Sequence, residues 1–573
     1  MKLTGAQILC ESLLKEGADV MFGYPGGVLL PFFDTLPQYP ALRHILVRHE
    51  QGAAHAADGY ARATGKVGVC LATSGPGATN LVTGIANAHL DSIPMVAITG
   101  QVARSFIGKD AFQEVDITGI TLPITKHNYL VTDVKHLAKI IKEAFYLARS
   151  GRPGPVLIDI PKDVFIEETE YKYPARVNLP GYNPTLTGHP SQIKKAAEMI
   201  NNASKKPVII AGRGVLVSEA YDELKQLAET ASIPVITTFL GVGCFPESHA
   251  LSYGMLGMHG MVYANWAIDA SDLIIAIGMR MDDRATSKVS EFAPHARIIH
   301  IDVDPAEIGK NVRVDVPIVG DVKRVLTALN KQIKPAEHVE WIEQVDEWRK
   351  DHPLVSARLR NEKNLTPQFV IRKLYEITKG DAIIVPGVGQ HQMWAAQHYW
   401  YDKPNRFISS GGLGTMGFEL PAAMGAKVGC PEKQVWCIAG DGGFQMTMQE
   451  LGTIIQDKIN VKIAIMNNGF LGMVRQWQDM FYEKRYVSTP LLCPDFVKIA
   501  EAYCIKALRV KLKDDVIPAL KEAAKTDGPF LIDFVVEPEE NVYPMVPPGE
   551  ALRNVIEEPQ KKEVYVWNQE NTP

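Results

Sequence analysis

The sequence predicts an α/β protein with three doubly wound, parallel-sheet domains. Short apolar runs rich in β-branched residues recur along the chain, and many end in Gly, Asp or Asn. Strands that are buried on both faces of a parallel sheet have such continuous runs, whereas half-exposed strands alternate between polar and apolar residues. Amphipathic helical patterns separate the runs, and this alternation of strand and helix is typical of doubly wound folds.

Two polar gaps divide the apolar runs into three groups. The gaps cover about residues 167–189, which include several prolines, and about residues 332–365, which are charged and helical in pattern. We expect linkers there. The predicted units are a domain at 1–170, a domain at 190–335, a domain at 365–540 and a C-terminal tail at 541–573. The tail is rich in proline and charge, and two interpretations stay open: a frayed terminus, or a segment that folds over a site.

The composition excludes several classes of protein. The formal net charge is −5 and no long basic run is present, which argues against a nucleic-acid or anionic-membrane partner. No uncharged apolar stretch reaches the ~18 residues that a membrane helix needs. The N-terminus reads as an amphipathic helix without a targeting pattern. The seven cysteines are scattered and mostly within apolar runs, as in a reduced, cytoplasmic protein.

The third predicted domain carries the strongest local motif. One apolar strand ends in Gly440-Asp441-Gly442-Gly443 and a second ends in Asn467-Asn468, with a separation of 468 − 441 = 27 residues. In a βαβ unit the two strand ends lie side by side at the carboxyl edge of the sheet, where such folds bind ligands. Glycines let the backbone approach a phosphate, and Asp441 and Asn468 offer the oxygen ligands that Mg²⁺ prefers. The motif therefore predicts a metal that bridges the protein and a diphosphate. The alternative is two unrelated turns.

This motif resembles the signature of the thiamine diphosphate enzymes, in which G-D-G is followed after about 25 residues by N-N. The resemblance implies three domains of the thiamine-diphosphate enzyme type and a Mg²⁺ ion held by Asp441, Asn468 and the backbone carbonyl of Phe470. It also implies a glutamate in the first domain that protonates the aminopyrimidine of the cofactor across a subunit interface. The candidate is Glu50, in RHEQGAAHAADGYARATG.

A lone glutamate is more often part of a solvated helix face than of a site. Glu50, however, follows an apolar strand and opens a helix of small residues with few charges nearby. Its assigned chemistry requires a poorly solvated carboxylic acid that can share a proton. A phosphate-loop-like turn, TSGPGATN, follows from Thr73.

Further motifs extend the resemblance over almost the entire chain. FGYPGG, TSGPGATN, GKDAFQEVD, GMRMDDR, VGQHQMWAAQ, GGLGTMGFELPAA and LGMVRQWQ are similar to segments of the acetohydroxyacid synthase (acetolactate synthase) family, in its catalytic large subunit. The resemblance implies a transferase of branched-chain amino-acid biosynthesis. It would decarboxylate pyruvate on thiamine diphosphate and join the two-carbon unit to pyruvate or 2-oxobutyrate, giving 2-acetolactate or 2-aceto-2-hydroxybutyrate.

The resemblance also assigns residues to the bound cofactor. Met416 would hold thiamine diphosphate in its bent form, and the Gly414 carbonyl would accept a hydrogen bond from it. Gln113 would reach the site from the first domain. The diphosphate end would contact Val388, Gln390, His391, Gly440, Gly442 and Gly443. Taken singly, these are equally compatible with core packing or helix capping.

A second group of residues would handle the substrates. Arg284 would recognise the carboxylate of the acceptor 2-oxo acid, for which a fork-shaped guanidinium is suited; its alternative is a surface ion pair with Asp282 or Asp283. Trp477 would favour 2-oxobutyrate as acceptor. The same channel would be lined by Met258, Met473 and Phe112. Lys162 would lie near its entrance.

The middle domain is implied to bind a structural FAD. Gly212-Arg213-Gly214 forms a glycine turn after a strand, suited to dinucleotide phosphates, although it lacks the full G-x-G-x-x-G pattern. The residues that match the family's binding segments are Arg152, Met258, His259, Gly278, Arg280, Asp302, Asp304 and Asp321.

Four residues depart from the family pattern. Glu419 stands where a small residue is expected, Gly387 where many relatives have Asp, Val28 where Ala is usual and Ala103 where Pro is frequent. Val28 and Ala103 lie in the region bound by herbicidal inhibitors, so we expect altered sensitivity to sulfonylureas.

Alternative functions remain at this stage. A related FAD- and thiamine-diphosphate-dependent pyruvate oxidase is the nearest, and a non-catalytic scaffold is the alternative from another class. Presence of Arg284 and Trp477 argues against the first, and presence of Glu50, Asp441 and Asn468 against the second. The expected assembly is a homodimer or homotetramer with shared active sites, with a possible small regulatory subunit.

Overall fold

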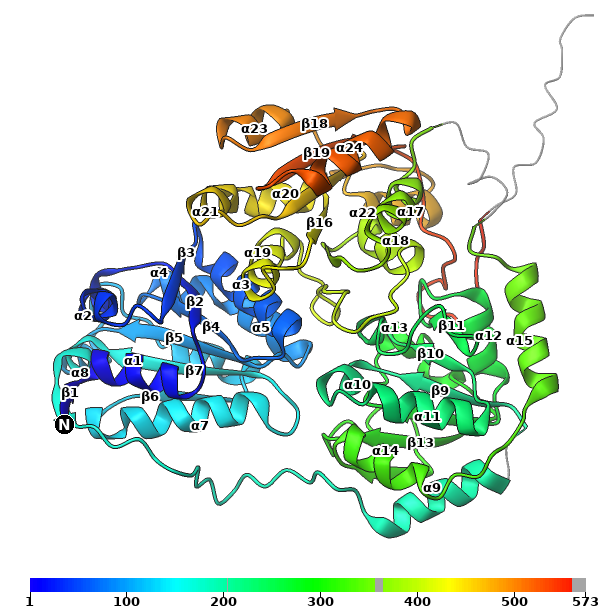
Figure 1. Cartoon of the computed structure of the whole chain (residues 1–573), viewed down its shortest axis with the longest axis horizontal. Coiled ribbons are helices and arrows are strands. Elements are labelled where there is room, and N and C mark those ends of the chain that lie inside the picture. The colour runs from blue at the N-terminus through cyan, green and yellow to red at the C-terminus, as the bar shows by residue number, and fades with distance from the viewer. Residues whose placement is uncertain (203–204, 356–363, 559–573) are drawn as a thin grey trace, which may run out of the picture.

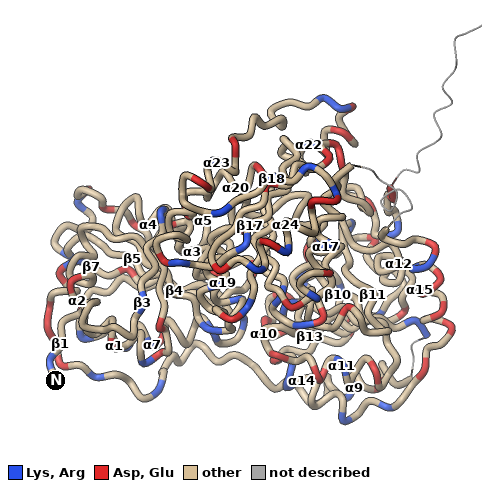
Figure 2. Tube along the Cα trace, turned by 45° about the horizontal axis from the view of Figure 1, so that its top comes forward, with Lys and Arg blue, Asp and Glu red and all other residues tan. Residues whose placement is uncertain are grey.

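The computed structural model describes residues 1–202, 205–355 and 364–558. Three parallel sheets with helices on both sides make up the molecule (Figure 1), so the predicted α/β class is confirmed. The boundaries proposed between the domains stay predictions. Acidic and basic residues are interspersed along the trace (Figure 2). No helix within the described ranges is long and apolar enough to cross a membrane.

The first sheet has the strand order β3-β2-β4-β5-β7-β6, and a short antiparallel pair, β1 and β8, lies beside it. The strands of the sheet are β2 (Val20–Gly23), β3 (Arg43–Leu46), β4 (Gly68–Ala72), β5 (Met95–Gln101), β6 (His127–Leu130) and β7 (Pro155–Pro161), and those of the pair are β1 (Lys2–Thr4) and β8 (Glu168–Glu170). Its helices are α1 (Gly5–Lys15), α2 (Leu30–Thr35), α3 (Glu50–Thr64), α4 (Pro76–Asn80), α5 (Val82–Leu90), α6 (Ile117–Thr121), α7 (Leu137–Arg149) and α8 (Lys162–Ile166).

The second sheet has the order β11-β10-β9-β12-β13-β14. Its strands are β9 (Pro207–Ala211), β10 (Val235–Thr237), β11 (Ser252–Met255), β12 (Leu273–Ile277), β13 (Arg297–Asp302) and β14 (Val316–Val319). The helices around it are α9 (Pro190–Asn202), α10 (Arg213–Val217), α11 (Tyr221–Ala231), α12 (Val262–Ala270), α13 (Asp283–Thr286), α14 (Val322–Asn330) and α15 (Val339–Asp351).

The third sheet has the order β15-β16-β17-β19-β18. Its strands are β15 (Ile383–Pro386), β16 (Val435–Gly440), β17 (Lys462–Asn467), β18 (Lys506–Val510) and β19 (Phe530–Val535). Its helices are α17 (Pro367–Thr378), α18 (Gln390–His398), α19 (Glu419–Gly429), α20 (Asp441–Thr447), α21 (Leu451–Gln456), α22 (Gly472–Phe481), α23 (Phe496–Ala502) and α24 (Lys513–Lys525). A 3₁₀ turn, η8 (Met448–Glu450), follows α20.

Helices α3 and α19 join the first domain to the third, and they lie against each other (Figure 1). Their backbones approach so closely that a Cβ at Gly59 would overlap the Ala422 carbonyl, and one at Gly425 would overlap the Ala56 carbonyl. Close helix packing requires such small side chains. The run of small residues after Glu50 is therefore explained by this contact, and a single core extends over both domains.

The tail after β19 packs against the second domain. Val546 and Leu552 are buried in the core of that domain. The backbone N–H of Val546 donates to the Met258 carbonyl at 2.7 Å, and the His259 ring lies 3.2 Å from the Pro544 carbonyl. The frayed interpretation thus fails for residues 541–558, whereas residues 559–573 lie outside the described part.

Candidate active site

Two adjoining cavities mark the candidate site. The larger, of about 1050 Å³, is lined by residues of all three domains, and the smaller, of about 60 Å³, lies at the carboxyl edge of the third sheet. Val388, Met416 and Met473 line both. Apolar side chains therefore form the boundary between the smaller and the larger cavity.

Asp441 and Asn468 lie side by side in the wall of the smaller cavity. They follow β16 and β17, which pair in parallel up to Gly440 and Met466, as the spacing of the motif predicts. The two Asp441 oxygens accept hydrogen bonds from Gly442 N and Gly469 N, each at 2.7 Å. Burial raises the pKa of the Asp441 carboxyl to about 6. A divalent cation would favour the ionised carboxylate again.

The side-chain amide of Asn468 is held at both ends. Its Nδ2 donates to Gln390 Oε1 at 3.3 Å, and its Oδ1 accepts from Phe470 N at 3.1 Å. Among the described residues, no three His, Cys, Asp or Glu side chains form a metal-binding group. Two protein oxygens at a cavity edge suit a cation that takes its remaining ligands from phosphate and water, as Mg²⁺ does.

The other side of the smaller cavity is formed by the start of α18. Gln390 and His391 are buried there. Burial lowers the pKa of His391 to about 3, so its imidazole is neutral near pH 7. Its Nε2 has no hydrogen-bond partner within the described structure. A buried, unpaired polar atom in a pocket wall points to a missing ligand, and this observation fits a bound diphosphate.

Glycines keep this edge of the sheet open. A Cβ at Gly440 would lie 2.7 Å from His391 Cε1, and one at Gly442 would lie 2.8 Å from a Leu471 methyl group. Gly443 also lines the smaller cavity, and Gly414, with φ of 70°, lines the larger one near Met416.

The glycines of the second domain serve the protein's own packing. A Cβ at Gly212 would overlap the Gly278 carbonyl, and one at Gly214 would lie 2.5 Å from Gly278 Cα. Gly214 N donates to Gly278 O at 2.8 Å. The turns after β9 and β12 thus touch each other, and Gly214 and Gly278 line the larger cavity while Gly212 does not.

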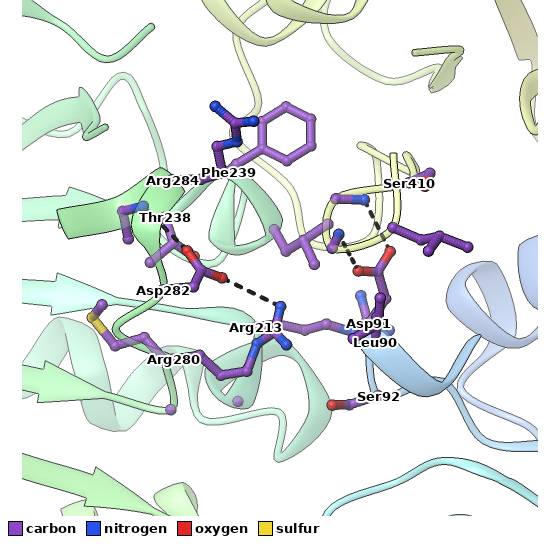
Figure 3. Close-up of a pocket in the computed structure, with 18 of the residues that line it drawn as sticks. Leu90, Asp91, Ser92, Arg213, Thr238, Phe239, Arg280, Asp282, Arg284 and Ser410 are labelled. Atoms are coloured by element: carbon purple, nitrogen blue, oxygen red, sulfur yellow. Dashed lines mark hydrogen bonds and ion pairs between the residues drawn. The ribbon is translucent and has the colours of Figure 1, made fainter. Parts of the chain in front are cut away.

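Charged side chains surround the larger cavity (Figure 3). Arg152 pairs with Asp304 at 3.0 Å and with Glu307 at 2.7 Å, while Arg280 lies 3.3 Å from Asp282. Arg213 is half-buried, and its Nε has no partner in the described chain. The predicted FAD residues in the wall are Arg152, Arg213, Gly214, Met258, His259, Gly278, Arg280, Asp302 and Asp321; Asp304 lies behind it.

The predicted acceptor residues also reach the larger cavity. Arg284, Trp477, Met258 and Met473 line it. The Arg284 side chain is 62% exposed, and its separation from Asp283 is 3.9 Å, so that ion pair is weak. Its Nη1 lies 3.4 Å from Met258 Sδ. The guanidinium is thus free of a strong partner among the described residues.

The first-domain candidates lie elsewhere. Glu50, Gln113, Phe112 and Lys162 line neither cavity. Phe112 is 87% exposed, and Gln113 and Lys162 are exposed too. Glu50 is buried at the start of α3, where Asn80 Nδ2 donates to its Oε2 at 2.9 Å. Within one chain, the structure does not bring these residues to Asp441.

Asp91 lies in the wall of the larger cavity and was not predicted from the sequence. Asp91 follows α5, accepts hydrogen bonds from Gly411 N and Gly412 N, and pairs with buried Arg62 at 2.8 Å. It connects the first domain to the loop that carries Gly414. No local pattern around it distinguishes it from a surface aspartate.

Two of the departures from the family pattern meet in space. The carboxyl of buried Glu419 occupies the position that a Cβ at Gly387 would take. A side chain at one position therefore requires glycine at the other. Val28 packs beside Gly100 in the first domain, and Ala103 precedes a 3₁₀ turn. The expected change in inhibitor sensitivity stays a prediction.

Comparisons with known proteins agree with this geometry. Residues 3–120 match the description "Thiamine pyrophosphate enzyme, N-terminal TPP binding domain", residues 193–329 the central domain and residues 387–534 the C-terminal TPP binding domain of that family. "Acetolactate synthase" of Mycobacterium bovis is 53% identical over 560 residues, which cover 96% of this chain and 90% of that protein.

Two further relatives come from distant organisms. "Acetolactate synthase large subunit" of Corynebacterium glutamicum is 52% identical, over 97% of this chain and 90% of the relative. "Probable acetolactate synthase large subunit" of Methanococcus aeolicus is 49% identical, over 97% and 95%. The chain therefore belongs to the thiamine pyrophosphate enzymes, and among them to the acetolactate synthase large subunit family.

Proposed function

We propose that this protein condenses two molecules of pyruvate to 2-acetolactate with loss of CO₂, and pyruvate with 2-oxobutyrate to 2-aceto-2-hydroxybutyrate. One observation carries the proposal. The pocket around Asp441 and Asn468 adjoins, across Met416 and Met473, a cavity whose wall holds Arg284 and Trp477. A cofactor site and a site for an anionic acceptor with a small side chain would thus be in direct contact.

The smaller cavity would hold the diphosphate of thiamine diphosphate and a Mg²⁺ ion. Asp441, Asn468 and the Phe470 carbonyl would bind the metal, and neutral His391 would donate a hydrogen bond to a phosphate oxygen. Gln390 would lie beside the diphosphate and hold the Asn468 amide. When bound, this cofactor supplies the carbanion that attacks the keto group of pyruvate. Met416, between the cavities, would support the ring end, and its apolar surroundings would keep water from the reacting carbon.

The larger cavity would also hold FAD. Its volume of about 1050 Å³ lies at the upper end of ligand pockets, which leaves room for a dinucleotide beside the substrates. Arg152, Arg213 and Arg280 would face its phosphates. The buried Nε of Arg213, which lacks a partner in the described structure, is the observation that supports an anionic ligand there.

Glu50 would complete the site from a second copy of the chain. Its carboxyl would hold the proton that the aminopyrimidine ring requires, and Gln113 would lie beside it. Exposed Phe112 and Gln113 support a contact with another subunit, because large apolar side chains on a surface mark interfaces. A homodimer or homotetramer follows. Two of the named relatives are large subunits, which supports a smaller regulatory partner.

One assay separates this proposal from its alternatives. Purified protein is incubated with pyruvate, Mg²⁺, thiamine diphosphate and FAD, with and without 2-oxobutyrate. Acetolactate without peroxide or reduction of an electron acceptor is the expected result. Peroxide or acetyl phosphate would identify an oxidase instead. Absence of any product, with cofactors bound, would identify a non-catalytic scaffold.

A further inference from the structure

Helix α22 and the start of the C-terminal tail meet behind the smaller cavity. Gln476, fully buried on α22, pairs with both backbone groups of Val542: Val542 N donates to Oε1 at 2.8 Å, and Nε2 donates to Val542 O at 3.1 Å. A backbone N–H only donates and a carbonyl only accepts. Val542 therefore fixes which end of the Gln476 amide is oxygen and which is nitrogen.

The Gln476 oxygen in turn fixes the amide of Gln390. Gln390 Nε2 donates to Gln476 Oε1 and to the Glu540 carbonyl, each at 2.9 Å. Both acceptors lie on the nitrogen side, so Gln390 Oε1 must face the other way. It faces Asn468, whose Nδ2 donates to it at 3.3 Å.

This chain of hydrogen bonds ends at the side-chain amide of Asn468. The Asn468 amide is held at both ends, because Gln390 accepts from its nitrogen and the Phe470 N–H donates to its oxygen. A hard cation binds an amide through oxygen, never through the NH₂ group. We propose that Gln476 is a positioning residue, which transmits the placement of residues 540–542 through Gln390 and so presents the oxygen of Asn468 to the metal. The inference rests on the metal site of the proposed function.

Gly472 gives independent support. A Cβ there would overlap Gln390 Oε1 and would lie 2.8 Å from Asn468 Nδ2. Gly472 is the first residue of α22 and does not have a positive φ, so its backbone would accept alanine. The absence of a side chain is required by the space that the Gln390–Asn468 hydrogen bond occupies.

Arg475 makes the proposal testable, because it holds the tail independently. Its Nη2 donates to the Glu540 carbonyl at 2.8 Å and to Asn541 Oδ1 at 2.7 Å. Replacement of Gln476 therefore leaves residues 540 and 541 anchored while the Gln390 amide loses one of its two acceptors.

The experiment measures how tightly Gln476→Met binds Mn²⁺ in the presence of saturating thiamine diphosphate. Mn²⁺ is a paramagnetic substitute for Mg²⁺. Free Mn²⁺ is followed by electron paramagnetic resonance. Loss of groups that orient metal ligands typically weakens metal binding 10- to 100-fold, and we expect about a tenfold increase in the Mn²⁺ dissociation constant. Excess Mg²⁺ should restore kcat, because Gln476 lines neither cavity.

Gln397→Met is the matched control. Gln397 is equally buried, lies on α18 with Gln390, and donates to the tail at the Tyr543 carbonyl (3.3 Å) and to the His259 carbonyl (3.0 Å). No hydrogen bond connects it to Asn468. Its Mn²⁺ affinity should stay within twofold of the unsubstituted protein. Equal weakening in both variants would overturn the proposal, since any loss of a buried amide would then suffice.

Two more variants complete the test. Gly472→Ala keeps Gln476 and the tail but blocks the Gln390–Asn468 contact, so it should weaken Mn²⁺ binding although alanine favours the helix. Unchanged affinity would overturn the proposal. Asp441→Asn should abolish the binding altogether. If Asp441→Asn still binds Mn²⁺, the metal lies elsewhere, and both the metal site of the proposed function and this inference are wrong. If only Gln476→Met binds Mn²⁺ normally, the inference alone is wrong.

Discussion

The third domain and the first domain carry the two thiamine pyrophosphate-binding parts of this chain, and they differ in how complete they are. In the third domain, Asp441, Gln390 and His391 are buried in one pocket, and hydrogen bonds hold the Asp441 and Gln390 side chains. In the first domain, Glu50 lies outside both cavities, and Phe112 and Gln113 are exposed.

The position of Glu50 explains this difference. The backbone N–H groups of Arg48 and His49, just before it, donate to the Glu450 carboxylate. Glu450 ends η8, whereas Asp441 begins α20, so Glu50 and Asp441 lie near opposite ends of one helical segment. This separation supports the part of the proposed function in which each site combines Glu50 of one chain with Asp441 of another.

The largest expected effect is the loss of turnover on substitution of either half. Glu50→Gln removes the proton-sharing acid, and general acid–base groups contribute roughly 10²- to 10⁴-fold, so kcat should fall by that factor. Thiamine diphosphate should still bind, because Asp441 and Asn468 are intact. Asp441→Ala should lose cofactor binding as well as turnover. Steady-state kinetics and cofactor binding by fluorescence quenching would measure both. Near-normal turnover of Glu50→Gln would refute its role.

Mixing the two inactive variants tests the division between chains. In a mixed dimer, one site combines intact Glu50 with intact Asp441 from the other chain. Random exchange of subunits should then restore about a quarter of the activity, since half of the dimers are mixed and each has one intact site of two. No recovery after coexpression, in mixtures shown to contain mixed dimers, would place both residues of a site in one chain.

Arg284→Ala should give the next largest effect. A charge-assisted hydrogen bond contributes roughly 1.5–3 kcal/mol, which corresponds to about 10- to 150-fold. We expect this loss in kcat/KM for formation of acetolactate, with release of CO₂ from the first pyruvate less affected. Arg284→Lys keeps the charge but not the fork and serves as the control. Equal loss of CO₂ release and acetolactate would show that Arg284 acts on the first substrate or on the fold.

Trp477→Leu should give a smaller effect that concerns selectivity. Trp477 lines the larger cavity and packs edge-on against Phe481 at 5.9 Å. Changes in apolar contact of about one methylene alter discrimination by roughly 10-fold or more. The ratio of the 2-oxobutyrate product to acetolactate, measured with both acceptors present, should therefore fall about tenfold while total turnover changes less. An unchanged ratio would exclude Trp477 from the acceptor site.

Much of the fold could be predicted from local patterns. Apolar runs such as VWCIA and VKIAIM become adjacent buried strands because both faces of the sheet are covered. The G-D-G and N-N motifs meet because consecutive parallel strands end at one edge. The small residues after Glu50 were part of the argument for a site, yet they serve the contact of α3 with α19.

Other features depend on contacts between distant segments and have no local signal. Asp91 gains its place from Gly411 and Gly412, more than 300 positions away. The same is true of the contact between the tail and residues Met258 and His259. It is also true of the chain of amide hydrogen bonds through Gln476. Glu419 and Gly387 were each unusual in the sequence, but only their contact shows that one compensates for the other.

Glu419 gives the last expected effect, which concerns the stability of the third domain and not turnover. Its buried carboxyl lies under Gly443, with Oε1 2.5 Å from the position of a Cβ there, and burial raises its pKa to about 7. The unfolded chain loses this proton near pH 4.5 and the folded chain near pH 7, so folding binds a proton in between.

The sign of the pH dependence follows. The stability that neutral Glu419 contributes is complete below about pH 4.5 and is lost as the pH rises through 7, by at most about 3 kcal/mol. Glu419→Gln stays neutral at every pH. Its melting temperature, relative to that of the unsubstituted protein, should therefore increase between pH 5 and 8 and then level off. A constant difference in melting temperature between Glu419→Gln and the unsubstituted protein from pH 5 to 8 would contradict this expectation. It would mean that Glu419 ionises in the folded protein as it does in water, and that the third domain contains a partner for its charge.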